Sequence, residues 1–234
     1  MLKKRIIPIQ LLIDDRLVKT VRFGQWRDVG DPVKSSSVYN SQYADELIFL
    51  NVARGNRTVA DLAKIIADVS KVCFMPMAMG GGIASAADAA FLILNGADKV
   101  VINSAAYSRP EIITETVRTF GSQAVIVCID AAWDVDLKTY RLYSNCGQRP
   151  VGVSLSDHVK RVTDAGAGEI MIQSIDRDGT MTGYDVELIT RTMRETSVPV
   201  IGAGGSGNYE HLKDAFLKTD VSAVACGSRV KHQL

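Results

Sequence analysis

The feature that most constrains this chain is an internal repeat of a glycine-rich strand end. Residues 75–82 are MPMAMGGG and residues 198–205 are VPVIGAGG. In each copy a helical stretch follows, and then a second apolar run that ends in a small polar pair, Asn103-Ser104 or Gly227-Ser228. The two copies lie about half of the 234-residue chain apart. A repeat of this length predicts a duplicated (β/α)4 unit.

Short apolar runs alternate with longer amphipathic stretches along the whole chain. We predict strands over residues 5–13, 46–52, 73–79, 99–103, 124–130, 169–174, 199–203 and 222–226. We predict helices over residues 59–69, 86–94, 111–118, 156–165, 186–194 and 209–217. Such alternation is typical of parallel strands joined by crossover helices. Eight strands favour one α/β domain over residues 1–234, a (β/α)8 TIM barrel of two half-barrels; a doubly wound open sheet is the alternative. Because the chain stops soon after the eighth strand, we expect the final helix to be short or missing.

Composition narrows the classes of function. Hydrophobic residues make up 47% of the chain and charged residues 23%, an ordinary globular balance. A net charge of +1 gives no strong field to attract nucleic acid or a membrane. The N-terminus shows no secretion signal and no apolar run has membrane-spanning length, so we expect a cytoplasmic protein. The four cysteines and three histidines have no metal-ligand spacing, so we expect free thiols, no metal and no cofactor.

The repeated glycines indicate a ligand with phosphate groups. Carboxyl-terminal strand ends form the active face of a barrel of this class. Glycine lets backbone N–H groups approach an anion, and the polar pairs precede possible helix N-termini, which favour phosphate. The candidate phosphate-binding residues are Gly81, Gly82, Asn103 and Ser104 in the first half and Gly204, Gly205, Gly227 and Ser228 in the second. Two equivalent clusters suggest a ligand with a phosphate at each end, although glycines can simply make tight turns.

Charged residues mark both ends of the predicted barrel. Asp130 ends the fifth strand and is a candidate general acid or base, with a loop-fixing role as the alternative. Asp178, in the loop after the sixth strand, and Lys19, in the loop after the first, are candidate ligand contacts. At the opposite end, four strands open with Arg5, Glu46, Lys99 and Glu169. These four could form a ring of ion pairs, which in the simplest view only stabilises the barrel bottom.

Together these residues resemble HisF, the cyclase subunit of imidazole glycerol phosphate synthase. The resemblance covers nearly the whole chain and is carried by residues 4–8, 30–32, 45–50, 80–83, 96–100, 120–124, 166–170 and 174–180. It implies a heterodimer with a HisH-like glutaminase, whose ammonia enters the barrel through a charged gate. It also implies that the ammonia reacts with a bisphosphorylated ribulosyl nucleotide (PRFAR), giving imidazole glycerol phosphate and AICAR. By resemblance, Arg5, Glu46, Lys99 and Glu169 match the gate, and Asp130 matches one of two catalytic carboxylates.

The sequence departs from the family at the other carboxylate. The family has Asp in its Pro-Cys-Leu-Asp-Val segment, where this chain has Leu11. Asn51 stands where Asp is usual, and Ala203 where Ser is common. Leucine cannot transfer a proton, and loss of a positioned acid or base typically costs on the order of 10²–10⁴ in rate. Asp14 and Asp15 follow in the next loop but are not expected to have equivalent geometry.

Three hypotheses therefore stand. Leu11-Leu12 and residues 15–20 resemble a side branch of second-copy HisF-like proteins (WbuZ type), which implies ammonia delivery to a sugar amidotransferase in surface-polysaccharide synthesis with impaired cyclase chemistry. This is the expectation from the sequence. The alternative is an active cyclase of histidine biosynthesis that tolerates Leu11. The third is a non-catalytic barrel that binds a bisphosphate or serves as a scaffold.

Overall fold

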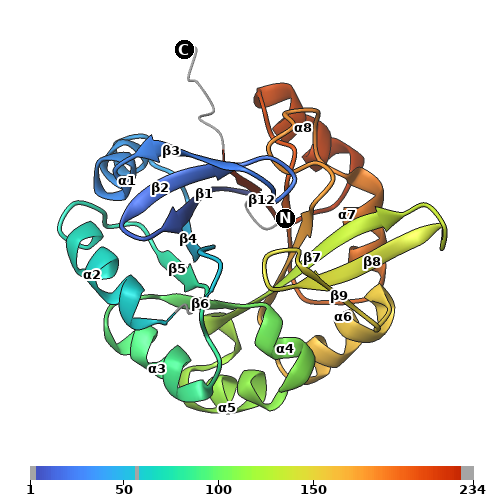
Figure 1. Ribbon diagram of the computed structural model, residues 1–234, viewed down its shortest axis with the longest axis horizontal. Coiled ribbons are helices and arrows are strands. Elements are labelled where there is room, and N and C mark those ends of the chain that lie inside the picture. Colours follow the sequence, from blue (N-terminus) through green and yellow to red (C-terminus); the bar gives the residue numbers. More distant parts are fainter. Residues whose placement is uncertain (1–3, 56–57, 228–234) are drawn as a thin grey trace.

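The computed structural model describes residues 4–55 and 58–227 and shows a closed barrel of eight parallel strands (Figure 1). In order around the barrel they are β1 (Arg5–Ile13), β4 (Leu47–Asn51), β5 (Met77–Gly80), β6 (Lys99–Ile102), β7 (Val125–Asp134), β10 (Glu169–Ser174), β11 (Val200–Ala203) and β12 (Ala223–Cys226). Pairing of β12 with β1 and of β7 with β10 closes the ring. The predicted α/β barrel is confirmed, and the open-sheet alternative is wrong.

Helices cover the outside of the barrel (Figure 1). They are α1 (Pro32–Ser41), α2 (Ala60–Val69), α3 (Ala86–Leu94), α4 (Ser104–Ser108), α5 (Glu111–Phe120), the 3-10 turn η1 (Ser122–Ala124), α6 (Leu155–Asp164), α7 (Val186–Arg194) and α8 (Tyr209–Lys218). Several begin at a side-chain cap: the side chains of Ser85, Ser154 and Asn208 each accept a hydrogen bond from the backbone N–H three residues later. Their apolar faces pack on the outward side chains of the strands in one large core.

Alternation along the strands builds a second, smaller core inside the barrel. On β1, Ile7, Ile9 and Leu11 point inward, and every other barrel strand contributes at least one inward side chain at the paired register. These are Ile48, Ala78, Val101, Ile126, Cys128, Met171, Ile201, Ala203, Ala223 and Ala225. Along the barrel axis, the inward-facing side chains are charged at the bottom and apolar in this layer, which extends up to the mouth.

Two hairpins rise from the barrel mouth, one in each half. β1 pairs antiparallel with β2 (Arg16–Thr20), which pairs with β3 (Trp26–Gly30). β7 pairs with β8 (Thr139–Ser144), which pairs with β9 (Arg149–Val151). Lys19 therefore lies in a strand, not in the loop that the sequence suggested. Apolar alternation is short here, so the hairpins are not predicted by pattern alone.

The two glycine-rich strand ends have the same backbone geometry. Gly81 and Gly82 have φ angles of 96° and 86°, and Gly204 and Gly205 have φ angles of 90° and 101°. A side chain on Gly81 would place its Cβ 2.2 Å from the carbonyl oxygen of Asn51, so a side chain cannot be accommodated there. The expectation of a short or missing final helix concerns residues beyond 227, which lie outside the described residues, as does Ser228.

The four cysteines are free thiols. Within the described residues, no helix is long and apolar enough to cross a membrane.

Candidate functional site

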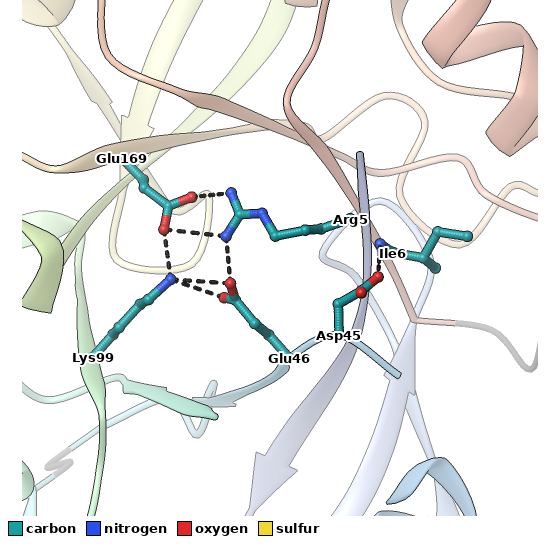
Figure 2. A network of polar contacts seen from close by, with 6 residues as sticks. All are labelled: Arg5, Ile6, Asp45, Glu46, Lys99 and Glu169. Atoms are coloured by element: carbon teal, nitrogen blue, oxygen red, sulfur yellow. Dashed lines mark hydrogen bonds and ion pairs between the residues drawn. The ribbon is translucent and has the colours of Figure 1, made fainter. Parts of the chain in front are cut away.

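At the bottom of the barrel four charged side chains form a closed ring (Figure 2). The guanidinium of Arg5 donates to the carboxylates of both Glu46 and Glu169. The ammonium of Lys99 lies 3.0 Å from Glu46 Oε2 and 2.6 Å from Glu169 Oε1. The expected ion-pair ring is therefore present, and its two positive and two negative charges cancel. Glu46 lies one residue before β4, whereas the other three open their strands.

The ring is mostly buried, and its ion pairs hold the four side chains in place. Their side chains are 9–21% exposed, so solvent screens them little. Burial raises the pKa of Glu169, but the hydrogen bonds and charges of Arg5 and Lys99 outweigh it and hold that pKa below its ordinary value. Asp45, beside the ring, fixes the start of β1 by accepting from the backbone N–H of Ile6 at 3.0 Å. Opening the ring requires breaking several charge-assisted bonds together.

At the mouth, Asp130 is the carboxylate of β7 that faces the barrel interior. Its Oδ2 accepts from Asn103 Nδ2 at 3.1 Å, and its Oδ1 accepts from the Cys128 thiol at 3.5 Å. Burial raises the pKa of Asp130 to about 7, against these two hydrogen bonds, which lower it. A carboxyl group with this pKa can both accept and release a proton near neutral pH, as general acid–base chemistry requires.

Asp130 lines a cavity of about 1060 Å³ at the mouth. Of the predicted site residues, Gly81, Gly82, Asn103 and Ser104 line the same cavity, so the structure brings the first half-site and the candidate acid/base together. Ser104 begins α4, and its Oγ accepts from the backbone N–H of Asn145 at 3.0 Å. The turn between β8 and β9 thus covers this half-site.

The second half-site lies elsewhere. A side chain on Gly204 would place its Cβ 2.6 Å from the carbonyl oxygen of Ser174, and Lys19 Nζ lies 3.4 Å from the Cβ position of Gly227. Lys19 lines a neighbouring cavity of about 1390 Å³, and burial lowers the pKa of its ammonium to about 8. Lys19 thus lies beside Gly227, at the end of β12.

Asp178 holds the hairpin in place. Its Oδ2 accepts from Thr20 Oγ1 at 2.7 Å and from the backbone N–H of Phe23 at 3.2 Å. Its backbone carbonyl accepts from the N–H of Arg22 at 2.9 Å. This carboxylate therefore ties the connection between β2 and β3 to the loop after β10. These contacts support a positioning role, while ligand contact by Asp178 stays a prediction.

Leu11 faces the same cavity as Asp130. It is 9% exposed and belongs to the inner apolar layer. Of the two carboxylates that follow it, Asp14 lines the cavity at a positive φ of 52°, whereas Asp15 is bonded to Lys64 at 2.9 Å outside it. Neither stands at the position of Leu11.

Sequence reasoning missed two polar neighbours of Asp130. Gln173 is its register partner on β10 and lines the cavity, and Cys128 donates to it from two residues earlier on β7. Strict alternation along residues 124–130 and 169–174 would have placed both side chains inside the barrel.

The chain matches known proteins over almost its full length. The family model described as histidine biosynthesis protein matches residues 5–233. Three similar relatives are each described as imidazole glycerol phosphate synthase subunit HisF. They come from Staphylococcus carnosus (40% identical), Lactiplantibacillus plantarum (41%) and Hydrogenobaculum sp. (42%), and the matches cover 97% of this chain and 90% of each relative. With its closed barrel and its shared sequence, the chain belongs to the HisF family of histidine biosynthesis proteins.

Proposed function

We propose that this chain is the synthase subunit of a HisF-type glutamine amidotransferase. A HisH-like glutaminase binds the barrel bottom, and ammonia passes through the charged ring and the barrel to a phosphorylated ligand at the mouth. The observation that carries the proposal is the placement of the ring and the Asp130 cavity at opposite ends of one barrel. The four free thiols suit the cytoplasm, where we place the reaction.

The barrel interior suits a small neutral molecule. Between the ring and the mouth, the inward side chains are apolar, and those of β5 and β12 are alanines. Ammonia can cross such a layer, whereas an ammonium ion would lose its hydration without gaining a partner. The ring would hold back cations until its ion pairs open.

We propose the reaction of PRFAR with ammonia, giving imidazole glycerol phosphate and AICAR. The names of the relatives favour this reaction over the sugar amidation that the sequence suggested. In it, Asp130 transfers the protons of ring closure, and Gly81, Gly82, Asn103 and Ser104 hold one phosphate group. Gly204, Gly205 and Gly227, with Lys19, hold the other.

A direct test is ammonia transfer in the complete complex. The chain is mixed with a HisH glutaminase, PRFAR and glutamine, and the formation of AICAR is compared with the hydrolysis of glutamine. The proposal predicts product in near one-to-one ratio to glutamate. Free ammonia accumulating without product would contradict it.

One observation favours a second candidate, delivery of ammonia to a sugar amidotransferase in polysaccharide synthesis. Leu11 removes the carboxylate that would share proton transfer with Asp130, while the ring at the bottom is complete. If PRFAR is bound but not turned over while a glutaminase is still bound, this candidate is favoured. If no glutaminase binds, the chain is better described as a phosphate-binding barrel alone.

A further inference from the structure

Three arginines line the cavity at the mouth, and none of them forms an ion pair within residues 4–55 and 58–227. They are Arg54, Arg109 and Arg149. Arg54 Nη2 donates to the carbonyl oxygen of Phe23 at 2.6 Å, in the connection between β2 and β3. Arg149 opens β9. Arg109 is bonded to the loop that follows β5, which carries the first glycine pair.

The guanidinium of Arg109 is held beside the first glycine-rich strand end. Arg109 directly follows α4, and its Nη1 donates to the carbonyl oxygen of Ala84 at 3.2 Å, two residues after Gly82. Ala84 is itself fixed, because its backbone N–H donates to Asp88 Oδ2 at 2.9 Å. Arg109, Ala84 and Gly82 line the same cavity. The sequence therefore places a cation next to the predicted phosphate half-site, at a position that the glycine pattern did not indicate.

The side chains of this half-site have no donor left for a phosphate. Both N–H groups of the Asn103 amide are used, by the carbonyl oxygen of Cys128 at 3.0 Å and by Asp130 Oδ2 at 3.1 Å. The single hydroxyl hydrogen of Ser104 is donated to Asn103 Oδ1 at 3.2 Å. Since glycine has no side chain, these residues offer a phosphate backbone N–H groups and no positive charge.

Arg109 can supply that charge. Its guanidinium has five N–H donors, and the bond to Ala84 is its single hydrogen bond to a residue that the structure describes. The other donors suit the oxygens of a phosphate, which guanidinium groups commonly bind in pairs. The positive charge would also offset the carboxylate of Asp130, which is bonded to the same Asn103 amide and would repel a phosphate nearby.

We infer that Arg109 binds the phosphate group of the ligand at the first half-site. The glycine pair then supplies backbone N–H groups, and Arg109 supplies the positive charge. Each half-site has one cation in this arrangement, Arg109 in the first and Lys19 in the second. The role of Arg109 rests on the phosphate half-site of the proposed function and adds to it the residue that recognises the charge of the ligand.

The test uses inorganic phosphate as the probe and Lys19→Met as the background, because that substitution removes the cation of the second half-site. Phosphate is titrated by calorimetry at pH 8, where it is mostly a dianion. Adding Arg109→Gln should weaken binding by about tenfold, since it removes charge-assisted hydrogen bonds from an exposed cation. Arg109→Lys should recover part of the affinity, because an ammonium keeps the charge but not the planar fork of donors.

Arg118→Gln is the matched control. Arg118 lies in the last turn of α5 and does not line the cavity, so its loss should change phosphate affinity by less than about twofold. Equal affinities in the Arg109→Gln and Arg118→Gln proteins would overturn the role of Arg109 and leave the half-site in place. If the Lys19→Met chain binds no phosphate, the first half-site of the proposed function fails, and the role of Arg109 fails with it.

Discussion

Leu11 and Asp130 occupy equivalent positions in the two halves of the barrel. Each is the first residue of its strand to pair with the following hairpin, Leu11 with Val18 and Asp130 with Tyr143. Each also pairs with the neighbouring barrel strand, at Leu50 and at Gln173. Of this pair, only Asp130 can transfer a proton.

The raised pKa of Asp130 predicts a pH dependence. If its carboxylate removes a proton from the ligand, kcat/KM should fall about tenfold per pH unit below the pKa of about 7 and level off above it. The profile is measured from pH 5.5 to 8.5 with ammonia supplied at constant free concentration. A flat profile between pH 5.5 and 7 would show that Asp130 is not the limiting base.

Restoring the second carboxylate should raise turnover. Leu11→Asp places an acid or base at the position equivalent to Asp130, and a positioned group of this kind contributes on the order of 10²–10⁴ in rate. We expect an increase in kcat at the lower end of that range, together with a lower urea midpoint, because the new carboxylate replaces a side chain of the inner apolar layer. The control Leu11→Asn should lower stability without raising kcat. A kcat unchanged by Leu11→Asp would mean that more than one group is missing.

Lys19 predicts a loss of phosphate affinity at alkaline pH. Its ammonium has a pKa of about 8 because it is buried, so it is charged at pH 7 and mostly neutral at pH 9. Phosphate is already a dianion over most of this range, so the lysine dominates the change. Binding of a bisphosphate ligand should weaken by roughly tenfold from pH 7 to 9. In Lys19→Met the affinity should already be low at pH 7 and vary little; equal pH dependence in both proteins would argue against a contact.

The ring at the bottom should matter for stability and for ammonia transfer. Lys99→Met leaves two neighbouring carboxylates with one cation, and we expect a loss of about 1–3 kcal/mol in unfolding free energy, because these charges are partly buried. Lys64→Met removes an exposed partner of Asp15 and should cost at most about 1 kcal/mol. Lys99→Met should also lower glutamine-driven turnover more than ammonium-driven turnover. Equal effects on the two would indicate a purely structural ring.

Much of the fold could be predicted from the sequence, because apolar periodicity dominates in a parallel barrel. The strands Arg5–Ile13 and Glu169–Ser174 and the helices Ala86–Leu94 and Val186–Arg194 have the predicted bounds. The strand predicted over residues 73–79 begins later, at Met77, because the N–H of Cys73 is bonded to Val69 at the end of α2 and Pro76 has no N–H to donate.

Helix α1 is not predicted by the apolar pattern, because the residues in the middle of the helix are polar. Its start is nevertheless readable, since Asp31 accepts from the N–H of Lys34 and Pro32 follows directly. The candidate site was predictable where it depends on strand ends, as for Asp130 and the glycine pairs. The positions of Lys19 and Asp178 depend on a hairpin folded back over the mouth, and such long-range contacts leave no local pattern.

The central claim is that Asp130 performs proton transfer on PRFAR at the barrel mouth. The most direct measurement is steady-state turnover of PRFAR with ammonium chloride by the isolated chain and by Asp130→Asn. The account predicts turnover in the unmodified chain that falls by at least about 10² in the variant, with folding unchanged by circular dichroism. PRFAR that binds but is not turned over by the unmodified chain, or equal turnover by the two proteins, would contradict it.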